Sequence, residues 1–210
     1  MKKIYLFMTM AMMAFATAFT ACEDEQVNPN NNDPQNNGDE NANYQMYSFN
    51  TTLNYNSLQP SAASAFCASS QQAVPATSSS ADFCVGTQRQ YGTFVCSPNA
   101  KELKDCYDAN YETHRIDFSN SKSTKIQDLG NVDIQDYYDV NTLEKMSVSS
   151  DYIDGKSSLG VGVNQLSSGQ VIAFQTSDGC KGVAKMSFSK VTKAVTISGY
   201  VAVPKNSSGK

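Results

Sequence analysis

The chain has 210 residues, and 16 lysines and arginines stand against 20 aspartates and glutamates, which gives a formal net charge of −4. Its only arginines are Arg89 and Arg115, so it lacks the basic surface that nucleic-acid binding requires. His114 is its only histidine, which excludes a multi-histidine metal site and an H-E-x-x-H motif. We therefore expect an acidic protein that binds neither nucleic acid nor a metal ion.

Residues 1–21 have the layout of a bacterial export signal, because two lysines precede an uncharged, mostly apolar run that ends in small residues. The sequence Phe19-Thr20-Ala21-Cys22 resembles a lipobox. This resemblance implies that residues 1–21 are removed and that Cys22 is acylated, for example with palmitate. Two alternatives stay open. Cleavage at Ala16-Thr17-Ala18 would leave Cys22 as a thiol, and an uncleaved run would be a short membrane anchor.

The residues after the lipobox predict how the chain is displayed. Glu23-Asp24-Glu25 resembles the export signal of surface lipoproteins of anaerobic Gram-negative bacteria, which implies an outer-membrane lipoprotein on the cell surface, with the periplasmic face as the alternative. Residues 22–45 are acidic and Asn-rich and hold too few apolar residues to offset the entropy of ordering, so we expect a disordered tether. Residues 46–205 are enough for a single β-domain, and residues 206–210 for a disordered tail.

The first half of the domain shows one clear strand pattern. From Tyr47 to Tyr55 apolar and polar residues alternate, which predicts a strand with one buried and one wet face. Residues 61–82 are mostly Ser and Ala and predict a long loop or a short helix. Residues 90–96 predict a second strand. Asn99 and Glu102 fit a capping box and predict a short helix.

The second half carries the strongest pattern. Residues 111–118 alternate with period two, whereas residues 126–153 fit neither the helical nor the strand period. Ser177-Asp178-Gly179 is a hairpin-turn sequence. Four strands are expected around it, in residues 159–163, 171–174, 184–188 and 195–203, as a meander with a buried and a wet face. We therefore predict an all-β fold: an antiparallel sandwich or a partly open barrel with a C-terminal four-strand meander and at most one or two short helices.

Cysteines past Cys22 are disulfide candidates in an exported chain. No two of them have the C-x-x-C spacing of a zinc or thioredoxin-type site. Cys67, Cys84, Cys96 and Cys106 allow three pairings, of which Cys67–Cys84 with Cys96–Cys106 is the simplest, and Cys180 is left over. The alternative is that several are small buried hydrophobic residues that stay reduced.

Few residues indicate chemistry. His114 lies on the apolar side of a predicted strand, which favours a packed imidazole. Carboxylates gather at Asp128, Asp133, Asp136 and Asp139, but without EF-hand spacing they favour a solvated acidic face over a Ca²⁺ site. The adjacent tyrosines at positions 137 and 138 suit recognition of a glycan or a protein, or simply fit a half-buried sheet surface.

A second resemblance concerns the C-terminal strands. Val171-Ile172-Ala173-Phe174, the turn at residues 177–179 and residues 182–188 are similar to segments of the haemophore-like (HmuY-like) lipoproteins. That family holds haem between two strand-borne axial ligands, which are His or Met. The resemblance implies haem as the cofactor, and the plausible ligands in this chain are His114, Met146 and Met186.

These observations predict a non-catalytic, lipid-anchored envelope protein that binds a ligand or serves as an accessory module. Its partners would be the membrane, through the lipid on Cys22, and a glycan or protein ligand, without a cofactor. Two alternatives remain at this point: a haem-binding lipoprotein, which needs an apolar cleft with a Met or His pair, and an envelope hydrolase, which needs two convergent acids.

Overall fold

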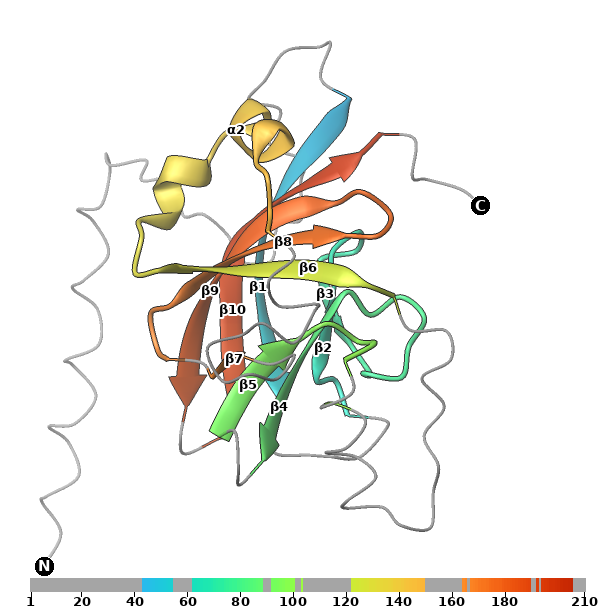
Figure 1. Cartoon of the computed structure of the whole chain (residues 1–210), viewed down its shortest axis with the longest axis vertical. Helices are drawn as coiled ribbons and strands as arrows, with labels where there is room; N and C mark the ends of the chain where they lie inside the picture. The colour runs from blue at the N-terminus through green and yellow to red at the C-terminus, as the bar shows by residue number, and fades with distance from the viewer. Residues whose placement is uncertain are drawn as a thin grey trace, which may run out of the picture.

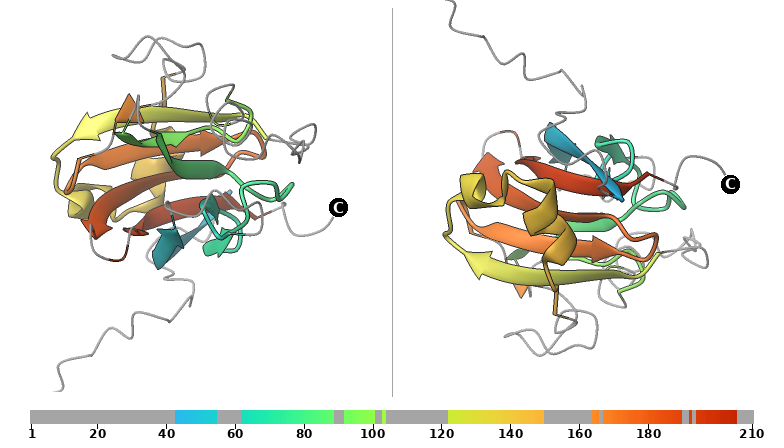
Figure 2. Two further views of the ribbon diagram at one scale, coloured as in Figure 1. Left: turned by 90° about the horizontal axis from the view of Figure 1, so that it is seen from below. Right: turned by 90° about the horizontal axis from the view of Figure 1, so that it is seen from above.

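The computed structural model describes residues 43–54, 62–88, 92–100, 103, 122–149, 164–165, 167–189, 192 and 194–205. These residues form two five-stranded antiparallel sheets that stack face to face (Figures 1 and 2). The predicted all-β sandwich is therefore confirmed. The signal segment, most of the tether and the predicted tail lie outside the described residues, as do Cys22, Cys106 and His114.

The first sheet joins the two ends of the domain. Its strands β1 and β10 pair along their whole length, from Tyr44 opposite Pro204 to Asn54 opposite Ala194. Three strands of the expected meander, β8, β9 and β10, lie side by side as predicted, whereas residues 159–163 are outside the described residues. The strand order is β1 (Tyr44–Asn54), β10 (Ala194–Pro204), β9 (Lys181–Ser189), β8 (Val171–Thr176) and β6 (Thr124–Gly130).

The second sheet contains strands that the sequence pattern did not reveal. Its order is β3 (Gln72–Val74), β2 (Ala65–Cys67), β4 (Phe83–Gln88), β5 (Gly92–Cys96) and β7 (Asn164–Gln165). The expectation of a loop or short helix over residues 61–82 was wrong, because this stretch contains the β2–β3 hairpin. Strands of three residues are too short to show a period. They are held in place by pairing, because β3 pairs with β2 and β2 pairs with β4.

Of the ambiguous stretch 126–153, the structure describes residues 126–149, which hold most of one strand and two short helices. After β6 comes the 3₁₀ helix η1 (Ile134–Tyr137), and then the α-helix α2 (Val140–Lys145). Of the helix expected after Asn99, the structure describes Leu103 as helical and buried. Within the described part of the chain, no helix is both long and apolar enough to cross a membrane.

Four phenylalanine rings form the centre of the core between the sheets. Phe49 and Phe174 come from the first sheet, and Phe66 and Phe83 come from the second. The ring centroids of Phe66 lie 4.6 Å from Phe49 and 5.2 Å from Phe83, and those of Phe83 and Phe174 are 5.3 Å apart. Tilted contacts at these distances are favourable for aromatic quadrupoles, so this cluster ties the two layers together.

The outer faces of both sheets are covered as well. The segment with η1 and α2 packs over the first sheet, where it buries Met46, Val171 and Val183 (Figure 2). On the second sheet, residues 74–81 together with Ala100 and Leu103 cover an apolar cluster of their own. The predicted wet face of the meander is therefore only partly wet. Local alternation cannot reveal that a distant one-turn helix covers the nominally polar side.

Candidate ligand-binding surface

Tyrosine rings lie half-buried on the outer face of the first sheet. Tyr137 and Tyr138 come from η1 and the residue after it, and Tyr200 comes from β10. The ring centroids of Tyr138 and Tyr200 are 5.0 Å apart in an edge-on arrangement. The Tyr200 hydroxyl donates a hydrogen bond of 3.1 Å to Oε1 of the exposed Gln135. We call these three tyrosines and Gln135 the tyrosine surface.

Local hydrogen bonds explain why the chain turns twice at this surface. Asp133 caps η1 by accepting from the Gln135 N–H at 3.0 Å. Asp139 caps α2 by accepting from the N–H of Thr142 at 2.9 Å and from its hydroxyl at 3.0 Å. Both carboxylates satisfy main-chain donors that the first turn of a helix leaves open. The chain can therefore make two short helices in succession without a long apolar face.

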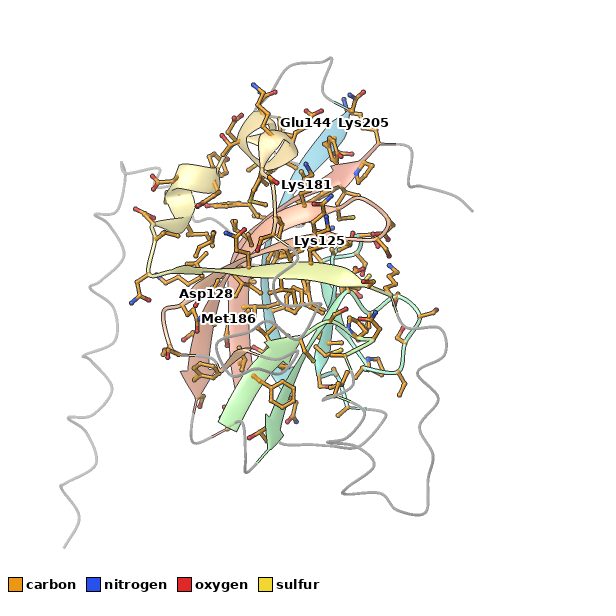
Figure 3. The ribbon with its side chains drawn as sticks, viewed as in Figure 1. Lys125, Asp128, Glu144, Lys181, Met186 and Lys205 are labelled. Carbon is orange, nitrogen blue, oxygen red and sulfur yellow. The ribbon has the colours of Figure 1, made fainter. Side chains whose placement is uncertain are left out.

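A lysine from the sheet holds the other end of α2. Lys181 Nζ donates to the carbonyl oxygens of Glu144 at 2.6 Å and Met146 at 3.0 Å (Figure 3). A cation at a helix C-terminus satisfies unpaired carbonyls and complements the helix dipole. Lys181 is the first residue of β9, so this contact fixes α2 over the sheet that carries Tyr200.

The chemistry of the tyrosine surface is that of a neutral, amphipathic binding patch. Burial raises the pKa of Tyr200, and its hydrogen bond to Gln135 only partly opposes that effect. Tyr200 therefore keeps its proton at neutral pH and stays a donor. Half-buried rings offer apolar edges and faces to a ligand, while the hydroxyls and the Gln135 amide offer hydrogen bonds.

The predicted acidic face is built mainly of structural carboxylates. Besides the caps Asp133 and Asp139, Asp128 Oδ1 accepts the Gly130 N–H at 2.7 Å where β6 shifts register. Asp136 is exposed in the single turn of η1. Within the described residues, no three His, Cys, Asp or Glu side chains are grouped so that they could hold a metal ion.

A partly buried ion-pair cluster joins three segments that lie far apart in the sequence, and the sequence pattern did not reveal it. Lys122 Nζ lies 3.0 Å from Oδ1 of the fully buried Asp82 and 2.8 Å from Oδ2 of Asp178. Asp82 Oδ2 also accepts the Ala68 N–H at 2.7 Å, and Asp178 accepts from the hydroxyl of Thr176. Lys122 lies between the two carboxylates, so this cluster is a crosslink between loops of both sheets.

The pKa values of the two carboxyl groups in this cluster shift in opposite directions. Burial raises the pKa of Asp82 more than the Ala68 N–H and the Lys122 charge lower it. Burial also raises the pKa of Asp178, but hydrogen bonds from Lys122 and Thr176 outweigh it and leave the pKa low. Burial raises the pKa of the neighbouring Cys180 thiol to about 12, so at neutral pH it is protonated and a poor nucleophile.

The residues suggested as haem ligands are not brought together in the described part of the chain. Met186 is fully buried between the sheets, where it packs against Ile197 and Ala184 (Figure 3). Met146 is half-buried beside α2 on the outer face of the same sheet. The two methionines thus lie on opposite faces of the first sheet and cannot ligate one haem from its two sides.

The cysteines depart from the simplest predicted pairing. No disulfide joins Cys67, Cys84, Cys96 or Cys180 to one another, and all four are buried. Ala65 pairs with Cys84 across β2 and β4, so Cys67 stands two residues beyond the position opposite Cys84. Such diagonal neighbours have Cα atoms roughly 7–8 Å apart, which is too far for a disulfide. The predicted Cys67–Cys84 bridge was therefore wrong, and the Cys96–Cys106 bridge reaches outside the described residues.

The fold and the tyrosine surface together define an antiparallel β-sandwich with a half-buried aromatic patch on a helix-covered outer face. Comparisons of the chain with protein-family models, with curated proteins and with solved structures found no match.

Proposed function

We propose that this chain is a lipid-anchored cell-envelope protein whose β-sandwich binds a carbohydrate at the tyrosine surface. The signal and lipobox at residues 1–22 support the anchoring, and the acidic residues that follow support display at the cell surface. The observation that carries the binding function is the Tyr138–Tyr200 pair, with its rings at 5.0 Å and the Tyr200 hydroxyl directed to an exposed amide.

A carbohydrate fits this chemistry better than a peptide does. A sugar ring has an apolar face of C–H groups that stacks on a half-buried aromatic ring, and its hydroxyls need both donors and acceptors. Tyr200 and Gln135 supply both kinds of group, and Asp136 adds an exposed carboxylate nearby.

A carbohydrate-binding experiment tests the proposal. The exported chain is screened against immobilised polysaccharides, and retained ones are titrated by calorimetry. We expect Tyr138→Ala to weaken binding at least about tenfold, because loss of an aromatic contact costs roughly 1–2 kcal/mol. Tyr47→Ala is the matched control, because Tyr47 is a half-buried tyrosine that packs on the inner face of the same sheet. No retention by any polysaccharide, or equal weakening by both variants, would contradict the proposal.

The anchor has its own test. Mass spectrometry of the native protein should find a mature N-terminus at Cys22 that carries acyl chains, and Cys22→Ser should release the protein from the membrane fraction. A mature terminus without acyl mass would contradict the anchoring and leave the carbohydrate experiment unaffected.

A further inference from the structure

Two cysteines face each other across the second sheet. Cys84 in β4 lies directly opposite Cys96 in β5 in the antiparallel register, so both side chains project from the same face. That face is the outer one, where both belong to the buried apolar cluster with Ala65, Phe94 and Leu103.

Main-chain hydrogen bonds define the spacing of this pair. The Val85 N–H donates to the Ser64 carbonyl at 2.8 Å, so the main-chain groups of Val85 point toward β2. Because successive residues of a strand alternate, the main-chain groups of Cys84 point toward β5. Cys84 and Cys96 are therefore a hydrogen-bonded pair, for which the Cα atoms are about 5.5 Å apart. This Cα separation lies within the range found for disulfides. The Cβ atoms of such a pair are about 5 Å apart, so they must approach by about 1 Å as the bond forms.

We propose that Cys84 and Cys96 form a cross-strand disulfide in the mature protein. The two thiols lose two protons and two electrons as the S–S bond forms, and a small-molecule or protein disulfide is reduced to two thiols in exchange. The bond closes the β4–β5 hairpin covalently. Among the described cysteines, no other one lies directly opposite Cys84 or Cys96, since Cys67 is only a diagonal neighbour of Cys84.

The burial of both residues determines when the bond forms. Cys84 is 0% and Cys96 1% exposed, so an oxidant cannot reach either thiol in the folded chain. Burial also raises the pKa of Cys84, which keeps this thiol protonated. Oxidation therefore takes place during folding, after β4 and β5 pair and before residues 74–81, Ala100 and Leu103 cover them. Once covered, the bond is protected from reductants.

Peptide mapping decides the pairing. The full chain is refolded in a buffer of oxidised and reduced glutathione, its remaining thiols are alkylated, and it is cut with trypsin and chymotrypsin without reduction. Cleavage after Phe83, Arg89, Phe94 and Lys101 separates Cys84, Cys96 and Cys106. We expect residues 84–89 and 95–101 as one linked species that is two hydrogens lighter than its parts and disappears on reduction.

Two results would overturn the proposal: recovery of both peptides in alkylated form, or linkage of residues 95–101 to the peptide that contains Cys106. Cys67→Ser is the matched control and should keep the linked species, whereas Cys84→Ser should lose it. The bond should also lower the unfolded fraction in urea by roughly a hundredfold relative to the reduced chain. Because the oxidant is supplied in the buffer, this outcome is independent of export and of carbohydrate binding.

Discussion

The ring of Phe174 lies across Gly182, its direct partner in the neighbouring strand of the first sheet. A Cβ atom at position 182 would overlap the tip of that ring and approach the Tyr200 carbonyl oxygen to 2.6 Å. The same relationship recurs where Phe49 lies opposite Gly199 and Phe94 opposite Gly86. In each pair the missing side chain makes room for an aromatic ring, and the ring in turn shields the glycine backbone. In the first sheet, this arrangement places Phe49 and Phe174 in the four-ring core.

Gly182→Ala should destabilise the fold by about 3 kcal/mol, because the new methyl group overpacks the core against backbone that cannot move aside. Urea unfolding followed by circular dichroism measures the change. Gly130→Ala is the control for backbone strain, since Gly130 has a φ of 71° but no atom within 4 Å of the added carbon; it should cost only about 1 kcal/mol. Phe174→Leu should partly rescue Gly182→Ala in a double-mutant cycle, and strictly additive costs would contradict the contact.

Lys122→Met should destabilise the protein by about 3 kcal/mol at neutral pH, because it leaves the buried Asp82 carboxylate without its cation. The loss of stability should shrink as the pH falls toward the ordinary aspartate pKa of about 3.9. The pKa of Asp82 is raised in the folded wild type, and removal of Lys122 raises it further. As the pH falls, the Asp82 carboxylate is therefore protonated in the folded chain before it is protonated in the unfolded chain, which removes the unpaired charge.

Asp178 acts in the same direction. In the wild type, the lowered pKa of Asp178 stabilises the fold at pH values above the ordinary aspartate pKa, and this stabilisation is lost on acidification. Without Lys122, the variant lacks the main cause of that lowered pKa. Thermal unfolding at several pH values checks both effects. A gap in melting temperature between wild type and Lys122→Met that stays constant from neutral to acidic pH would contradict this account of the cluster.

Asp139→Ala should cost about 1 kcal/mol, because it removes the cap of α2. Asp139→Asn keeps an acceptor at the cap and should cost little. Burial slightly raises the pKa of Asp139, but hydrogen bonds from Thr142 and Asn141 outweigh it and lower the pKa. The charged cap therefore stabilises the fold above the ordinary aspartate pKa of about 3.9 and loses this effect as the pH falls through the lower folded value. Chemical unfolding across this range should show the wild type and the Asn variant converging in acid.

Lys181→Met should loosen α2 from the sheet at a cost of about 2 kcal/mol, since charge-assisted hydrogen bonds to two helix-end carbonyls are lost. Hydrogen exchange should become faster over residues 140–146 and stay unchanged in β9 and β10. Lys185→Met is the control, because Lys185 lies on the same outer face of β9 but is exposed, and it should change stability by less than about 0.5 kcal/mol. Equal exchange in the two variants would show that Lys181 does not hold the helix.

The sequence predicted those elements whose signal is local. The alternation that begins at Tyr47, the apolar run of β8 and the turn at residues 177–179 each specify their structure within a few residues. The structure confirms the alternation as far as Asn54, and it confirms the other two. The three-residue strands β2 and β3 carry no such signal. They are strands because β4 pairs with β2, which is a contact between segments well apart in the chain.

The candidate site was predictable only in part for the same reason. Tyr137 and Tyr138 are conspicuous as neighbours in the sequence, but Tyr200 joins them from more than sixty residues away through the position of β10. Nothing near Lys122 in the sequence indicates that Asp82 and Asp178 will flank it. Met186 is a possible haem ligand only through the resemblance to the haemophore-like lipoproteins, whereas its place between the sheets depends on the order of the strands.

The sequence by itself determined the longer strands β1, β8, β9 and β10 and the turn between β8 and β9, since the two-residue period and the preference for turns act over a few neighbouring residues. The prediction of an export signal at residues 1–21 also rests on a local sequence pattern. Only the tertiary structure decided which faces are covered, which cysteines stand opposite each other and which charges meet. These depend on strand order and register, and both are set by contacts between residues that the chain places far apart.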